Sequence, residues 1–241
     1  MARTIAEILL ERINRMPNGY IFTSSDFYDK VSDPTALSRA LRTLVKEGKI
    51  RKISKGRFDK PKRTILGELP PSEEWMLQEF LMDGKKIVGY MSGQYAYSRL
   101  GLSTQISSVY TIGSNTYRRA VQRGAYTIRF ILQPNTITRA NIPLLQLLDA
   151  IRFIRQIPAC TPNEACVILR TNIRNLSAEE RKQLASLAMG YTSYVRAIVG
   201  AMLDETGEET EGLYRSLNPA SAYKIGLTEA ALPNRKKWRV G

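Results

Sequence analysis

The side chains that could do chemistry in this sequence are mostly cationic, and many of them lie close together. Between residues 39 and 63 the chain has 11 Lys and Arg residues against 2 Asp and Glu residues. Arginine can donate paired hydrogen bonds to the O6 and N7 atoms of guanine, and lysine can neutralise a phosphate. This segment therefore favours recognition of double-stranded DNA.

Several of these cations belong to a helix predicted over 34–47, with Asp33 as its N-cap and Gly48 after its end. At about 100° per residue, one face is apolar and consists of Leu37, Ala40, Leu41, Leu44 and Val45. The opposite side carries the residues predicted to contact DNA: Thr35, Ser38, Arg39, Arg42 and Lys46. The alternative is a merely solubilising surface. The near absence of interleaved acidic residues argues against that alternative.

A second group of cations follows this helix. Two short strands are predicted at 50–54 and 57–61 around a Lys55-Gly56 turn. The residues of this hairpin predicted to contact the DNA backbone are Arg51, Lys52, Lys55 and Arg57. The alternative interpretation is a charged edge that prevents aggregation.

The elements before this hairpin are expected to position both groups. Apolar residues at helical spacing predict a helix over 3–16, and a capping pattern at Thr23 predicts a short helix to about residue 30. Three helices followed by a β-hairpin is the order of a winged helix-turn-helix. We therefore predict such a DNA-binding domain over 1–66, followed by a linker at the paired prolines of 67–71.

The rest of the chain, 67–241, is predicted to be a mixed α/β domain, which makes the whole protein α+β. Helices are expected over 72–82, 94–100 and 141–154, and from Ser177 toward residue 203. Strands are expected at 86–90, 109–112, 117–121 and 126–132, and they suggest a small antiparallel sheet. The acidic segment 204–211 is predicted to be a solvated loop.

Composition excludes many enzyme classes. The 241 residues include no histidine and only two cysteines, which removes imidazole-dependent catalysis and the usual zinc sites. No phosphate-binding loop is present, and Gly113-Ser114 is not followed by the paired aspartates that a nucleotidyltransferase needs. We therefore expect no enzymatic activity, cofactor or metal. The formal charge of +14 and the lack of a long apolar run predict a cytoplasmic protein that binds nucleic acid and not membrane.

Two groups of motifs resemble the AbiEi family, antitoxins of type IV toxin-antitoxin and phage-abortive systems. In the first domain they are Tyr20-Ile21-Phe22-Thr23, Ala36 to Leu41, Leu44 to Lys52, and Lys55 to Phe58. In the second they are Leu66 to Pro71 and Ser92 to Gln105. The chain departs from the family at Tyr95-Ala96-Tyr97-Ser98, where relatives commonly have Ala-Ala-Asn. The resemblance covers roughly residues 1–130.

The resemblance implies an antitoxin that represses its own operon by binding operator DNA. It also implies that the protein counteracts a nucleotidyltransferase toxin without requiring a stable complex with it. The residues leave open whether two chains pair on an inverted repeat. They also leave an alternative: a winged-helix transcriptional regulator whose second domain serves dimerisation or sensing, with no toxin partner. A nucleic-acid-processing enzyme is a more distant third interpretation.

Overall fold

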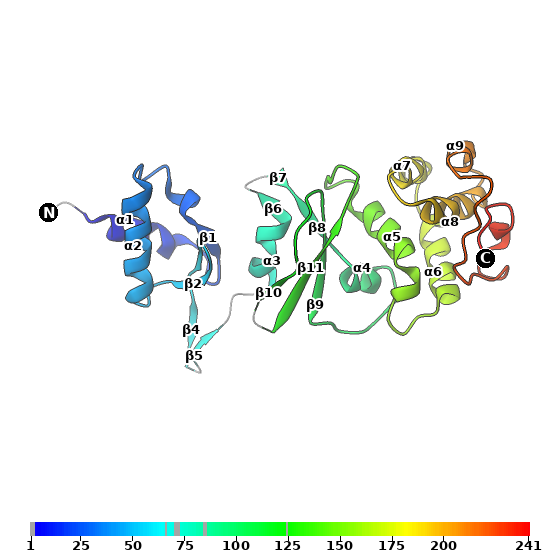
Figure 1. Cartoon of the computed structure of the whole chain (residues 1–241). Helices are drawn as coiled ribbons and strands as arrows, with labels where there is room; N and C mark the ends of the chain where they lie inside the picture. Colours follow the sequence, from blue (N-terminus) through cyan, green and yellow to red (C-terminus); the bar gives the residue numbers. More distant parts are fainter. Residues whose placement is uncertain (1–2, 66, 70–72, 84–85, 124) are drawn as a thin grey trace. The chain divides into compact units, whose positions relative to one another are not determined.

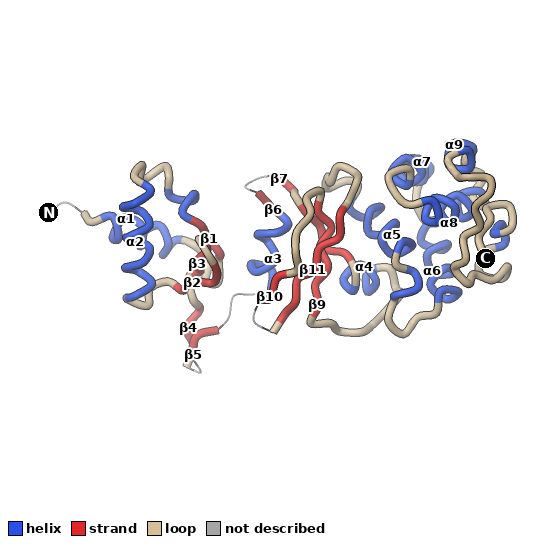
Figure 2. Tube along the Cα trace, in the orientation of Figure 1, coloured by secondary structure: helices blue, strands red, loops and turns tan. Residues whose placement is uncertain are grey.

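The computed structural model describes residues 3–65, 67–69, 73–83, 86–123 and 125–241. The chain divides into two compact units, Met1–Glu79 and Phe80–Gly241. Most of their helices and strands are labelled in Figure 1, and Figure 2 shows the same trace by secondary structure. The predicted α+β class is confirmed. The division falls later in the chain than the predicted linker, of which Pro70 and Pro71 lie outside the described residues.

The first unit begins with helices and strands in alternation. In chain order it contains α1 (Ile5–Arg15), β1 (Ile21–Thr23), the 3-10 helix η1 (Ser24–Phe27), α2 (Pro34–Lys46), β2 (Arg51–Ser54) and β3 (Arg57–Asp59). The three strands form an antiparallel sheet in the order β1-β3-β2. Strand β1, which is only three residues long, was not predicted, and the helix expected to reach residue 30 is the single turn η1.

A small hairpin and a helix follow this sheet. Strand β4 (Lys62–Thr64) pairs with β5 (Gly67–Leu69), so part of the predicted linker is a strand. Helix α3 (Glu73–Leu81) contains the boundary between the two units.

Local signals in the sequence set the bounds of α1 and α2. Thr4 and Glu7 form a reciprocal capping box at the start of α1. The Asp33 carboxylate accepts a hydrogen bond from the Thr35 N–H, and Pro34 occupies the first turn of α2. Gly48 follows α2 with a φ of 67°, a conformation that glycine adopts without strain. The predicted apolar face of α2 is confirmed, because its leucines are buried in the core of this unit.

The second unit combines one sheet with a group of helices. Its first elements are β6 (Met82–Asp83), β7 (Lys86–Ile87), β8 (Gly89–Ser92), α4 (Gln94–Arg99), β9 (Val109–Ser114), β10 (Val121–Arg123) and β11 (Tyr126–Leu132). The four longer strands have the order β10-β11-β9-β8. The predicted small antiparallel sheet is confirmed in part, because β8 with β9 and β10 with β11 are antiparallel, whereas β9 and β11 are parallel. Sequence patterns report which residues form strands, whereas strand direction depends on the path of the connections.

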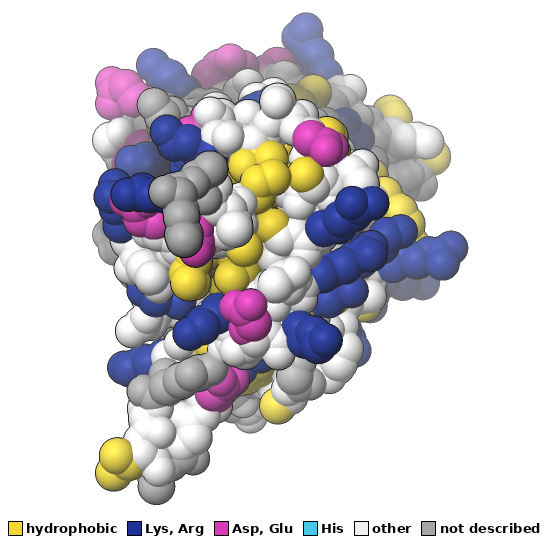
Figure 3. Space-filling model, turned by 90° about the vertical axis from the view of Figure 1, so that its left-hand side faces the viewer, with side chains coloured by type: hydrophobic (Ala, Val, Ile, Leu, Met, Phe, Trp, Pro, Cys, Tyr) yellow, Lys and Arg dark blue, Asp and Glu magenta, His cyan; other side chains and the backbone are white. Residues whose placement is uncertain are grey.

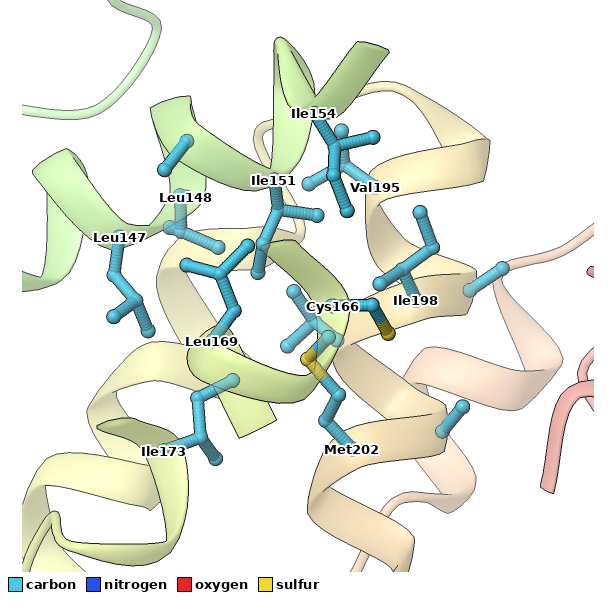
Figure 4. Packing of buried hydrophobic residues seen from close by; sticks show 14 of the residues in the cluster. Leu147, Leu148, Ile151, Ile154, Cys166, Leu169, Ile173, Val195, Ile198 and Met202 are labelled. Atoms are coloured by element: carbon cyan, nitrogen blue, oxygen red, sulfur yellow. The ribbon is translucent and has the colours of Figure 1, made fainter. Parts of the chain in front are cut away.

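Helices form the remainder of this unit. They are α5 (Ile142–Arg152), η2 (Ile154–Gln156), α6 (Pro162–Arg174), α7 (Ala178–Ala188), α8 (Ser193–Asp204), α9 (Glu211–Arg215) and η3 (Pro233–Arg235). Side chains of α5, α6 and α8, such as Ile151, Leu169 and Ile198, meet in one buried core (Figure 4). Among the described residues, no helix is both long enough and apolar enough to cross a bilayer.

The acidic segment 204–211 differs in part from its prediction. Asp204 accepts hydrogen bonds from Lys237 Nζ at 2.8 Å and from Asn234 Nδ2 at 3.1 Å. Glu205 forms ion pairs with Arg170 and Arg174 of α6, at 2.5 and 2.8 Å. The predicted loop is therefore confirmed for 205–210, between α8 and α9, but its carboxylates are not simply solvated, because they join the end of α8 to basic residues from distant parts of the sequence.

Candidate nucleic-acid interface

The outward face of α2 is exposed and cationic. All five residues predicted there are exposed: Thr35, Ser38, Arg39, Arg42 and Lys46. Within the described parts of the chain, no acidic group forms an ion pair with Arg39, Arg42 or Lys46. Figure 3 shows a face of the N-terminal unit on which Lys and Arg side chains gather in a band. These positive charges are therefore available to an anionic partner.

A rigid aromatic core holds α2 in place. The Phe22 ring lies 5.6 Å from the Phe27 ring and 6.1 Å from the Phe58 ring, centroid to centroid. All three rings are buried together with the leucines of α2. One ring from β1, one from η1 and one from the hairpin thus pack as one cluster, which fixes α2 relative to β2 and β3.

An ion pair secures the segment between η1 and α2. Arg12 of α1 contacts both carboxylate oxygens of Asp29, at 2.6 and 2.7 Å. Its guanidinium hydrogen bonds hold the pKa of Asp29 below its ordinary value. The same guanidinium lies over the Phe27 ring at 5.7 Å. These contacts join α1 to the chain that leads into α2.

The four cations of the β2–β3 hairpin differ in whether a carboxylate of the protein pairs with them. Lys52 and Lys55 are exposed, and among the described residues no carboxylate pairs with either one. Arg51 instead donates two hydrogen bonds to the fully buried Asp59, at 3.1 and 2.6 Å. Arg57 forms an ion pair with Glu79 of α3. Four hairpin residues were predicted to contact the DNA backbone. Among the described residues, only two of them, Lys52 and Lys55, have no carboxylate partner within the protein.

Strand register explains the Arg51 pair. Arg51 and Asp59 lie directly opposite each other on β2 and β3. Opposite charges at such paired positions attract and fix the register. A regular two-residue turn would pair Arg51 with Lys60, nine positions on, and only the β-bulge that shifts the register brings Asp59 opposite it. The spacing alone therefore did not predict the pair.

Lys60 has a structural role that was also not predicted. Its Nζ atom donates to the carbonyl oxygens of Asn14 and Met16, at 2.8 and 3.2 Å. These carbonyls lie at the end of α1, where unpaired acceptors favour a cation. The two hydrogen bonds of Lys60 therefore connect the end of the hairpin to the end of α1.

A buried polar network centres on Asp149 in the second unit. Its carboxylate accepts hydrogen bonds from Tyr90 and Tyr191 hydroxyl groups, at 2.6 and 2.9 Å, and from Ser92 Oγ at 2.8 Å. Gln133 Nε2 donates to both tyrosine oxygens, at 2.8 and 2.7 Å. Burial raises the pKa of Asp149, while the three hydroxyl donors act in the opposite direction. This network connects the sheet with α5 and the start of α8. Sequence reasoning missed this network. The feature that could have indicated it is a carboxylate between Leu148 and Ala150 in an otherwise apolar helix.

Three tyrosines near the start of the second unit differ in their exposure. Tyr90 and Tyr97 are buried, and Tyr95 is 44% exposed. Burial raises the pKa of Tyr97 to about 12. In the described residues, no three His, Cys, Asp or Glu side chains are grouped so that they could hold a metal ion.

Comparisons with known proteins place the chain in a family without an assigned function. The sequence profile of a family of unknown function, DUF6088, matches residues 8–153. No curated protein matches the chain. Among solved structures, the RV2827C protein from Mycobacterium tuberculosis is similar with 15% sequence identity and a TM-score of 0.43. That match covers 93% of this chain and 86% of the other.

Proposed function

The chain belongs to DUF6088, a family of unknown function, and we propose from its own residues that it is a winged helix-turn-helix regulator of double-stranded DNA. In this proposal α2 is the recognition helix and the β2–β3 hairpin is the wing. Support comes from the order of helices and strands, α1-β1-η1-α2-β2-β3, which is the order of that fold. The aromatic cluster and the Arg12–Asp29 pair would hold the recognition helix against the wing.

The observation that carries the proposal is the face of α2 opposite its buried leucines. Arg39, Arg42 and Lys46 are exposed there without an acidic neighbour in contact among the described residues. A face of this kind, on a helix of 13 residues, fits the major groove, where arginine reads guanine and lysine neutralises phosphate. A merely solubilising face would usually mix both signs of charge.

Binding of the full chain to DNA from upstream of its own gene tests the proposal. We expect salt-dependent binding in fluorescence anisotropy, with a higher affinity for that DNA than for a scrambled duplex. Arg39→Ala and Arg42→Ala should each cost about 1–3 kcal/mol. Arg139→Ala, which removes an exposed arginine of the second unit, is the matched control. Equal affinity of the parent and all three variants would overturn the assignment of α2.

The resemblance to AbiEi antitoxins extends this proposal. The protein would repress its own operon and counteract a nucleotidyltransferase toxin encoded beside it. The motif from Ser92 to Gln105, which spans α4, supports this extension. The alternative is a regulator without a toxin, in which the second unit serves dimerisation or sensing.

A further inference from the structure

A cavity of about 310 Å³ lies in the second unit, whereas the residues proposed to bind DNA belong to the first unit. It opens where α5 ends, next to η2, the first turn of α8 and the segment 222–225. The lining residues that matter here are Arg152, Phe153, Arg155, Tyr194, Tyr223 and Lys224. Their chemistry is cationic and aromatic.

The charged side chains that line this cavity are all cationic, and one of them, Arg152, also donates to the Leu132 carbonyl at 3.3 Å. Arg152, Arg155 and Lys224 line it, and none of its lining residues is acidic. In the part of the chain that the structure describes, no carboxylate forms an ion pair with any of the three. Other cations of this unit are neutralised, as Arg170 is by Glu205. Three cations around one hollow favour an anion, and arginine is suited to phosphate.

Aromatic rings form the other part of the lining, and contacts hold them in place. The Tyr194 hydroxyl donates to the Arg152 carbonyl at 2.6 Å. The Arg152 guanidinium lies 5.1 Å from the centre of the Phe153 ring. The Tyr223 ring is partly buried and packs against the hydrophobic core of this unit. Positioned rings and a guanidinium plane favour a flat aromatic ligand.

We propose that this cavity binds a mononucleotide. The phosphate would be held by the three cations, and the base would stack on the tyrosine and phenylalanine rings. The volume lies at the lower end of the range for small-molecule sites, so it suits one nucleotide and not a dinucleotide or a peptide. This inference goes beyond the proposed function, since none of its residues belongs to α2 or the hairpin.

Isothermal titration of the full chain with AMP, GMP, CMP and UMP tests the proposal. We expect at least one of them to bind at physiological salt. Arg155→Ala and Lys224→Ala should each weaken that binding about tenfold, because each removes a charged contact to phosphate. Both side chains are exposed, so these substitutions should leave the melting temperature unchanged.

Two control variants and two control ligands separate this site from others. Arg139→Ala tests for general loss of charge, and Arg39→Ala tests for nucleotide bound at the DNA-binding face; neither should change the affinity. Adenosine and inorganic phosphate should each bind at least tenfold more weakly than the nucleotide, because each lacks one half of the proposed contacts. The proposal is wrong if no mononucleotide binds at millimolar concentration, if Arg155→Ala and Lys224→Ala bind as well as the parent, or if phosphate alone binds equally well.

Discussion

Two neighbouring cations of strand β2, Arg51 and Lys52, have different environments. Arg51 neutralises Asp59, which is fully buried, while Lys52 is exposed and has no carboxylate partner among the described residues. The formal charge is the same at both positions. Only Lys52 is thus available for a phosphate without a cost to the fold.

Arg51→Ala should therefore destabilise the N-terminal unit. The substitution leaves a buried carboxylate without its guanidinium, and we expect a loss of about 1–3 kcal/mol in the free energy of unfolding. Lys52→Ala is the matched control and should change stability by less than about 0.5 kcal/mol. Urea denaturation measures both. A stable Arg51→Ala protein would mean that Asp59 does not depend on Arg51.

The buried Asp149 should make stability depend on pH. Because its pKa is raised in the folded chain, the unfolded chain releases this proton first as the pH increases above about 4. The free energy of unfolding should then fall with pH until the raised pKa is passed. For a single titrating group, the free energy of unfolding cannot change by more than about 1.4 kcal/mol per pH unit.

The difference in free energy of unfolding between the parent and Asp149→Asn isolates the contribution of Asp149. In urea denaturation at a series of pH values, the stability advantage of the parent should shrink as the pH rises. Glu179→Gln, at an exposed position, is the control and should show no such trend. An advantage that grows with pH would show that the hydroxyl donors outweigh burial and lower the pKa of Asp149.

At the level of elements, the β2–β3 hairpin carries two kinds of cation. Arg51 and Arg57 pair with carboxylates of the protein, whereas Lys52 and Lys55 can contact phosphates. The double substitution Lys52→Ala/Lys55→Ala should weaken binding to specific and non-specific duplexes alike. It should also reduce the slope of log K against log salt by about 0.9 for each phosphate that is no longer neutralised. Lys182→Ala, which removes an exposed lysine of α7, is the control. An unchanged salt slope would mean that the hairpin does not touch the DNA backbone.

Helix α8 depends on close contact between Gly200 and Trp238. A methyl group at Gly200 would overlap the buried ring of Trp238. Gly200→Ala should therefore lower stability by about 1–3 kcal/mol despite the better helix propensity of alanine. Gly212→Ala in α9, where the added methyl meets open space, should not destabilise the protein. Thermal unfolding compares the two; similar melting temperatures would contradict the packing argument.

At the scale of the whole molecule, DNA binding and the proposed antitoxin activity are expected to reside in different units. The cationic face of α2 lies in the first unit, while the α4 motif that resembles antitoxins lies in the second. The full chain carrying Arg39→Ala and Arg42→Ala should therefore lose repression yet still protect cells from the cognate toxin.

Colony survival on toxin induction, with each protein supplied from an independent promoter, measures this separation. Loss of protection in the double variant, at parental protein levels, would show that both activities share α2. If the parent protein itself gives no survival, the antitoxin proposal fails, and the alternative regulator remains. The proposal of DNA binding would be unaffected by that result.

The sequence alone determined the features that depend on local spacing. Helical periodicity and capping residues predicted α2 to within one residue, because Asp33, Pro34 and Gly48 act through neighbouring backbone groups. Strand β11 was predicted with the same bounds from its apolar and β-branched residues. The exposed face of α2 also followed from periodicity.

Tertiary structure decided which charges and polar groups meet. The partners Arg51 and Asp59, Glu205 and Arg170, and Asp149 and Tyr90 are separated by 8, 35 and 59 positions in the chain. Such pairs depend on strand register and helix packing, which no local pattern encodes. The parallel direction of β9 and β11 and the cationic cavity beside α5 arose in the same way, because they require segments far apart in the sequence to be brought together.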